Sequence, residues 1–82
     1  MSNIRSIKVS ISLEIALDYG EAVKWYRNAA DQGHREAQYY LGIRYAYGEG
    51  VSQDLFEAIK WIREAADQGH FHAKSALKML FS

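Results

Sequence analysis

An internal repeat constrains the fold of this chain more than any other feature. When the sequence is shifted against itself by 36 positions, residues 18–41 align with residues 54–77, and 14 of the 24 aligned pairs are identical. Chance alone gives about one or two identities over such a window at ordinary residue frequencies. A repeated unit of this size cannot bury its apolar face alone, so the units are expected to stack on one another as a solenoid.

Each copy has the periodicity of an amphipathic α-helix. Apolar side chains recur at positions i, i+3, i+4 and i+7, first at Ala22, Trp25, Tyr26 and Ala29 and then at Ala58, Trp61, Ile62 and Ala65. This spacing places four side chains on one face of a helix. We therefore expect both tryptophans, Trp25 and Trp61, to lie in the core.

Both helices carry start and stop signals. An aspartate and a glutamate with capping-box spacing open each copy and a glycine follows it, at Asp18, Glu21 and Gly33 and again at Asp54, Glu57 and Gly69. An aspartate in the cap position accepts backbone N–H groups of the first turn, and glycine readily adopts the left-handed conformation that ends many helices.

A second kind of helix is predicted between the two copies. From residue 35 to residue 47, Ala37, Leu41 and Tyr45 fall four apart on one face, which is expected to be buried. Beside Leu41, Gly42 has no side chain, so a neighbouring helix can approach closely there.

The order of these elements predicts the fold class. The glycine-containing segment 48–51 ends the second helix, and residues 71–81 repeat part of that helix. The chain is thus predicted to be all-α, a solenoid of antiparallel helix pairs with about one full repeat and two half repeats.

Residues 37–70 resemble a complete Sel-one-like repeat, a relative of the tetratricopeptide repeat. The matching features are Ala37, Leu41, Gly42, Tyr45, Gly48, Gly50, Val51, Asp54, Ala58, Trp61, Ala65, Ala66 and Gly69. Half repeats of the same kind cover 18–36 and 71–81, so the repeat module is expected over 18–82. The resemblance implies an α/α right-handed superhelix whose relatives usually act as adaptors or scaffolds in multi-protein assemblies. This functional expectation is an analogy from fold.

The first 17 residues have three possible structures. The segment 7–15, IKVSISLEI, alternates apolar and polar residues as a half-buried strand does. Its isoleucines also fall at helical spacing, although β-branched residues are poor helix formers. Strand, helix and disordered leader all stay open for residues 1–17.

Composition excludes several classes of function. Ten basic and ten acidic residues give a formal charge of zero, without the basic excess typical of a nucleic-acid-binding protein. The absence of cysteine excludes disulfides, thiolate metal sites and a cysteine nucleophile. No apolar run approaches the roughly 20 residues that span a bilayer, so no membrane partner is expected. We expect the protein in the cytoplasm.

No active site or metal site is predicted. His34 and His70 are repeat equivalents in turns, and His72 follows two residues later, where its side chain would diverge from that of His70 on a helix. A turn or capping role is therefore favoured over metal binding, which needs three or four converging ligands. No nucleophile, base and orienting group share a predicted face. We expect neither catalysis nor a cofactor.

The predicted binding residues lie on the middle helix, beside its buried face. They are large side chains of types favoured at interfaces: Tyr39, Tyr40, Ile43, Arg44 and Tyr47. Three of them, Tyr39, Ile43 and Tyr47, are expected to face the concave groove. The alternative for Tyr39 and Tyr40 is packing between repeats.

Two functions are consistent with this pattern. The first is an adaptor that binds a peptide or protein in the groove. The alternative is a self-associating structural repeat, a homo-oligomer joined through uncapped ends, because the tail 77–81 and the segment 7–15 are rich in apolar residues.

Overall fold

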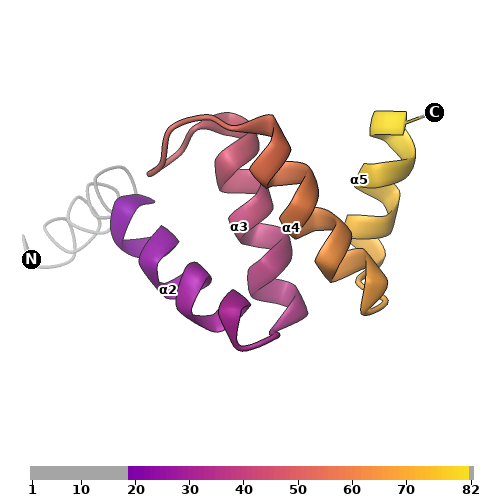
Figure 1. Ribbon diagram of the computed structural model, residues 1–82, viewed down its shortest axis with the longest axis horizontal. Helices are drawn as coiled ribbons and strands as arrows, with labels where there is room; N and C mark the ends of the chain where they lie inside the picture. The colour runs from indigo at the N-terminus through magenta and orange to yellow at the C-terminus, as the bar shows by residue number, and fades with distance from the viewer. Residues whose placement is uncertain (1–18, 82) are drawn as a thin grey trace, which may run out of the picture.

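The computed structural model describes residues 19–81, which form four α-helices in chain order (Figure 1). They are α2 (Tyr19–Asp31), α3 (Arg35–Tyr47), α4 (Leu55–Asp67) and α5 (Phe71–Phe81). The all-α helical repeat is thereby confirmed, whereas the right-handed superhelix stays a prediction. The three possible structures of residues 1–17, the domain boundary after residue 17 and the cap at Asp18 lie outside the described residues.

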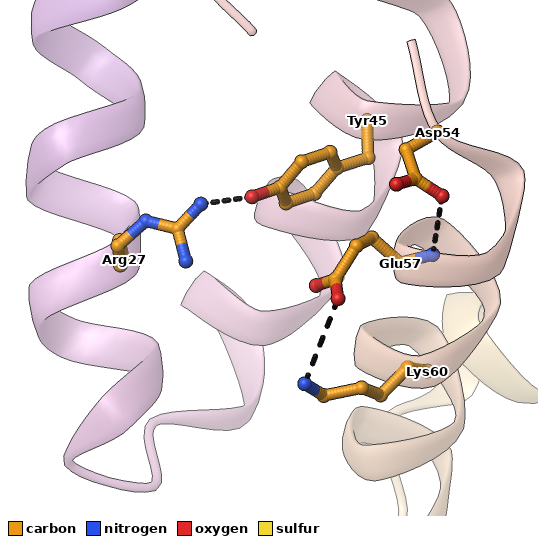
Figure 2. Close-up of polar contacts among 5 residues, drawn as sticks. All are labelled: Arg27, Tyr45, Asp54, Glu57 and Lys60. Atoms are coloured by element: carbon orange, nitrogen blue, oxygen red, sulfur yellow. Dashed lines mark hydrogen bonds and ion pairs between the residues drawn. The ribbon is translucent and has the colours of Figure 1, made fainter. Parts of the chain in front are cut away.

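Consecutive helices pack side by side: α2 on α3, α3 on α4, and α4 on α5 (Figure 1). The turns between them have the predicted chemistry. Gly33 and Gly69 adopt φ angles of 91° and 86°, in the left-handed region that ordinary side chains avoid. At the start of α4, the side chain of Asp54 accepts the backbone N–H of Glu57 at 3.1 Å, as a helix cap does (Figure 2).

The apolar core consists of two clusters that the repeat relates to each other. The first contains Val23, Ala30, Ala37, Leu41 and Trp61. The second contains Ile62, Ala65, Ala66 and Ala73, with Leu77 packed against it. Ala66, Ala73 and Leu77 are the 36-residue counterparts of Ala30, Ala37 and Leu41. Each helix pair therefore uses the same positions to build its part of the core.

Helices α3 and α4 approach each other closely at Gly42. A Cβ atom added to Gly42 would lie 2.6 Å from Cγ1 of Ile62 and 2.9 Å from the backbone oxygen of Ala58. Both distances are shorter than real van der Waals contacts. Only glycine allows this approach, as the sequence predicts.

A polar contact joins the outer helix to the middle one. The guanidinium of Arg27 on α2 donates to the hydroxyl of Tyr45 on α3 (Figure 2). On the neighbouring α4, Lys60 pairs with Glu57 at 3.8 Å and lies 5.3 Å from the centre of the Trp61 ring. These contacts line the side of the molecule where α2 and α4 face each other across α3 (Figure 2).

One prediction about the core is right for Trp61 and wrong for Trp25. Trp61 is 8% exposed, whereas Trp25, its counterpart on α2, is 70% exposed. Trp61 is covered because it shares a core cluster with Val23 and Ala30 of α2 and with Leu41 of α3. Among residues 19–81, no helix precedes α2 to cover Trp25 in the same way.

The Gly42 contact predicts a specific loss of stability. Replacing Gly42→Ala is expected to lower the free energy of unfolding by about 1–3 kcal/mol, because the methyl group meets the backbone of α4 as well as Ile62. Urea unfolding followed by circular dichroism measures this change in the free energy of unfolding. Gly20→Ala is the control, since nothing lies within 4 Å of an added Cβ there. That change should be neutral or stabilise by up to about 1 kcal/mol. If Gly42→Ala and Gly20→Ala changed stability equally, the close packing of α3 on α4 at Gly42 would be contradicted.

The two tryptophans provide a second, matched test. Trp61→Ala is expected to cost about 3–5 kcal/mol, because it leaves a large cavity in the first core cluster. Trp25→Ala should change stability by no more than about 0.5 kcal/mol, as is usual for an exposed position. Thermal unfolding of both variants measures the two changes in stability. A large loss of stability for Trp25→Ala would contradict the exposure of that side chain.

Candidate functional site

The middle helix presents one exposed stripe of large side chains. Glu36, Tyr40, Ile43 and Tyr47 are spaced 4, 3 and 4 residues apart, which places them on one side of α3. We call these four residues the α3 stripe. Tyr40 is 43% exposed and Tyr47 is 70% exposed, with Ile43 half-buried between them. The other sides of α3 are occupied, because α2 and α4 pack there.

Aromatic rings continue from this stripe across the neighbouring helices. Successive ring centres lie 5.5, 5.6, 4.6, 5.9 and 5.5 Å apart in the order Tyr26, Tyr40, Tyr39, His70, His72 and Phe71. We call these six residues the aromatic row. It begins on α2, crosses α3 and ends on α5, so it joins three helices through side chains that lie next to the α3 stripe.

His70 holds the centre of the aromatic row in place. It is 5% exposed, and its ring stacks on Tyr39. Its Nδ1 accepts the backbone N–H of Ala73 at 3.1 Å, and its Nε2 lies 3.3 Å from Oε1 of Glu36. Because Nδ1 accepts a hydrogen bond, a ring hydrogen lies on Nε2, the atom that faces the Glu36 carboxylate. His70 thus caps α5, ties it to α3 and confirms the predicted capping role. His34, its counterpart, makes no side-chain cap hydrogen bond.

Arg44 occupies the side of α3 that faces α2. Its guanidinium pairs with Glu49 and lies 4.7 Å from the centre of the Tyr19 ring. Partial burial acts to lower the pKa of Arg44, but interactions with Glu49 and Tyr26 outweigh it and raise the pKa above its usual value. The side chain therefore stays cationic and is already engaged within the molecule.

The five predicted binding residues thus have different surroundings. Tyr40 and Tyr47 are exposed, Ile43 and Tyr39 also pack against the second core cluster, and Arg44 is paired. Their role in binding stays a prediction. Sequence reasoning missed two neighbours, Glu36 and His72. Extending the stripe by one turn before Tyr40 would have found Glu36, whereas the contact between His72 and Tyr39 depends on the packing of α5.

Among residues 19–81, no three histidine, cysteine or acidic side chains lie together as metal ligands would. None of the helices α2 to α5 has the length and the apolar character to cross a bilayer.

The chain is similar to proteins built from one kind of repeat. A family model described as Sel1 repeat matches residues 13–34 and 35–70, together 58 of the 82 residues. A crystal structure of a Sel1 repeat protein from Oxalobacter formigenes is 43% identical over 74% of this chain, with a TM-score of 0.73. This chain spans only 25% of that protein's length. No curated protein matches the sequence.

These matches confirm the resemblance that the repeat motif predicts. Sel1 repeats form a non-enzymatic class of scaffold repeats and are generally protein-interaction modules. The kind of site typical of this repeat is therefore a surface that binds another protein.

The capping role of His70 predicts how the stability of α5 responds to mutation. His70→Ala is expected to lower the free energy of unfolding by about 1–2 kcal/mol, because α5 loses its cap. Hydrogen exchange should show the first turn of α5 opening more often. His70→Asn should recover part of the loss, since asparagine is a good cap. The matched control is His34→Ala, which removes an exposed side chain without a cap bond. Similar losses for His70→Ala and His34→Ala would contradict this role.

Proposed function

Because the chain belongs to the Sel1 repeat family, we propose that it is a protein-interaction module and that the α3 stripe holds a peptide or protein partner. The function is binding. The repeat pairs act as the rigid support, and the side chains left uncovered on the middle helix make the contact. Arg44 and Tyr39 support the stripe from either side.

The exposed tyrosines on α3 are the observation that carries the proposal. Tyr40 and Tyr47 lie two turns apart on a helix that is packed between two others. Tyrosine offers a large contact area and a hydroxyl group, and it loses little conformational freedom on binding. Such side chains on a rigid helix are typical of interface hot spots. Ile43 supplies apolar surface between them.

The length of the stripe limits what it can hold. From Glu36 to Tyr47 the helix rises about 16 Å, at 1.5 Å per residue. This length matches about five residues of an extended peptide or about three turns of a helix. The proposed partner segment is therefore short, with apolar groups for the tyrosine rings and a hydrogen-bond donor for Glu36.

Self-association is the second candidate function. It is favoured by apolar side chains in the last turn of α5, where Met79, Leu80 and Phe81 are 80%, 58% and 60% exposed. Contiguous exposed apolar surface marks association sites. Sedimentation at high protein concentration tests this function, and a monomer under those conditions would rule it out.

The tyrosines predict which variants lose a partner. Tyr47→Ala and Tyr40→Ala are each expected to weaken binding about tenfold or more, as hot-spot truncations do. Affinity capture from the source cells, with partners identified by mass spectrometry, gives the candidate, and titration of the purified pair gives the loss. Phe56→Ala is the matched control, because Phe56 is an aromatic residue of α4 that is 89% exposed and lies outside the stripe.

The binding titration can also contradict the proposal. If a partner binds the native chain and all three variants equally, the α3 stripe is not its site. Ile43→Asp would also abolish binding, but Ile43 packs against the second core cluster, so that change alone cannot separate binding from folding. Tyr47→Ala avoids this ambiguity, because the Tyr47 side chain is 70% exposed.

A further inference from the structure

The last helix has an exposed face that is distinct from the α3 stripe. Phe71, Lys74, Ser75 and Lys78 fall at i, i+3, i+4 and i+7 and line a shallow hollow of about 500 Å³ along α5. We call these four residues the α5 outer face. Phe71 is 73% exposed, and both lysines are exposed. The opposite side of α5 packs on α4 through Ala73 and Leu77.

The repeat shows what this kind of face does elsewhere in the molecule. The 36-residue counterparts of the α5 outer face are Arg35, Gln38, Tyr39 and Gly42 on α3. There, α4 and its following turn cover the face. Gly42 lies directly against Ile62, and Arg35 Nη1 donates to the backbone oxygen of Gln68 at 2.8 Å. Gln68 Nε2 also donates to Gln38 Oε1 at 2.8 Å. Among residues 19–81, no helix covers the same face of α5.

The lysines of the α5 outer face differ from those of α2 and α4 in having no acidic neighbour. The lysines of α2 and α4 each have a glutamate three residues earlier: Lys24 lies 3.9 Å from Glu21, and Lys60 lies 3.8 Å from Glu57. Lys74 and Lys78 have no such neighbour, because α5 contains no acidic residue. Within the described part of the chain, neither ammonium group lies within 4.0 Å of a carboxylate. The α5 outer face is therefore a helix-packing face with two uncompensated positive charges.

We propose that the α5 outer face binds an acidic amphipathic helix of a partner protein, which lies along α5 as α4 lies along α3. Lysine at 78 in place of glycine keeps the partner helix from the close approach seen at Gly42. Carboxylates on that helix bridge the wider gap, because the lysine side chains reach outward to them. Phe71 supplies the apolar contact at the start of α5.

The spacing of Phe71, Lys74 and Lys78 along α5 determines the residue pattern expected in the partner helix. Lys74 and Lys78 are four residues apart, about 6 Å along the axis, so the facing carboxylates are also one turn apart. Because α4 runs antiparallel to α3 (Figure 1), the partner helix meets Lys78 first and Phe71 last. It therefore carries Glu-x-x-x-Glu-x-x-Leu or an equivalent pattern.

A designed peptide tests this inference with the 82-residue chain. The probe is a labelled alanine-based helix of about 15 residues with the pattern Glu-x-x-x-Glu-x-x-Leu, and its control carries glutamine at both glutamate positions. Fluorescence anisotropy is expected to show binding of the acidic peptide that is weaker in 0.5 M salt. The double replacement of Lys74→Gln and Lys78→Gln should reduce affinity about 2- to 30-fold, the combined effect of losing two exposed ion pairs. Lys24→Gln with Lys60→Gln is the matched control and should leave affinity unchanged.

Charge reversal locates the contact. Lys74→Glu with Lys78→Glu should abolish binding of the acidic peptide and create binding of a peptide with lysine at both positions. Circular dichroism should show an unchanged fold, because both lysines are exposed. Equal affinity for the acidic and glutamine peptides, or equal affinity of both double variants, would overturn the inference. So would concentration-dependent self-association that the Lys74 and Lys78 variants remove, since the occupant would then be a second copy. Loss of binding at Tyr47 concerns the α3 stripe alone, so the two proposals fail independently.

Discussion

The close approach of α3 and α4 at Gly42 is the contact on which the rest of this structure depends. With no side chain at Gly42, Ile62 and the backbone of Ala58 lie directly against α3. This approach brings Trp61 over the end of α2, so that one tryptophan closes the first core cluster. It also places the turn after α4 beside α3, where Gln68 contacts Arg35 and Gln38. The close approach at Gly42 thus goes together with contacts of α4 and its following turn to both α2 and α3.

The same packing decides which surfaces are left for partners. On α3, two sides are taken by neighbouring helices, and the remaining side presents Tyr40 and Tyr47. His70 fixes the edge of that surface, since it caps α5 and stacks on Tyr39. On α5, one side packs on α4 through Ala73 and Leu77, and Lys78 stands where α3 has Gly42. Among residues 19–81, no further helix covers the outer side of α5.

Much of the fold could be predicted because its determinants are local. The spacing of Ala58, Trp61, Ile62 and Ala65 places them on one face, and all four are buried. The glycines at 33 and 69 and the cap at Asp54 act within a single turn of chain, so their roles follow from residue type. Trp25 shows the limit of this reasoning. Its periodicity equals that of Trp61, but its burial depends on a covering helix, which a periodic pattern does not report.

The candidate site was less predictable because it depends on contacts between distant residues. Tyr39 and Tyr40 were predicted as large side chains beside a buried face, but the ring that holds Tyr39 belongs to His70, 31 positions later. Arg44 pairs locally with Glu49, but it meets Tyr19 only when α2 packs on α3. The residue types therefore indicate an interface. Only the structure shows which of these side chains are exposed and which already contact other residues of the chain.

Hydroxyl-radical footprinting of the 82-residue chain, alone and with its captured partner, tests the central claim that binding uses the side of α3 that helix packing leaves open. The account predicts that Tyr40 and Tyr47 are oxidised readily in the free chain and are protected by the partner, while Trp25 and Phe56 react equally in both samples. Protection at Trp25 or Phe56, with Tyr40 and Tyr47 unchanged, would contradict it.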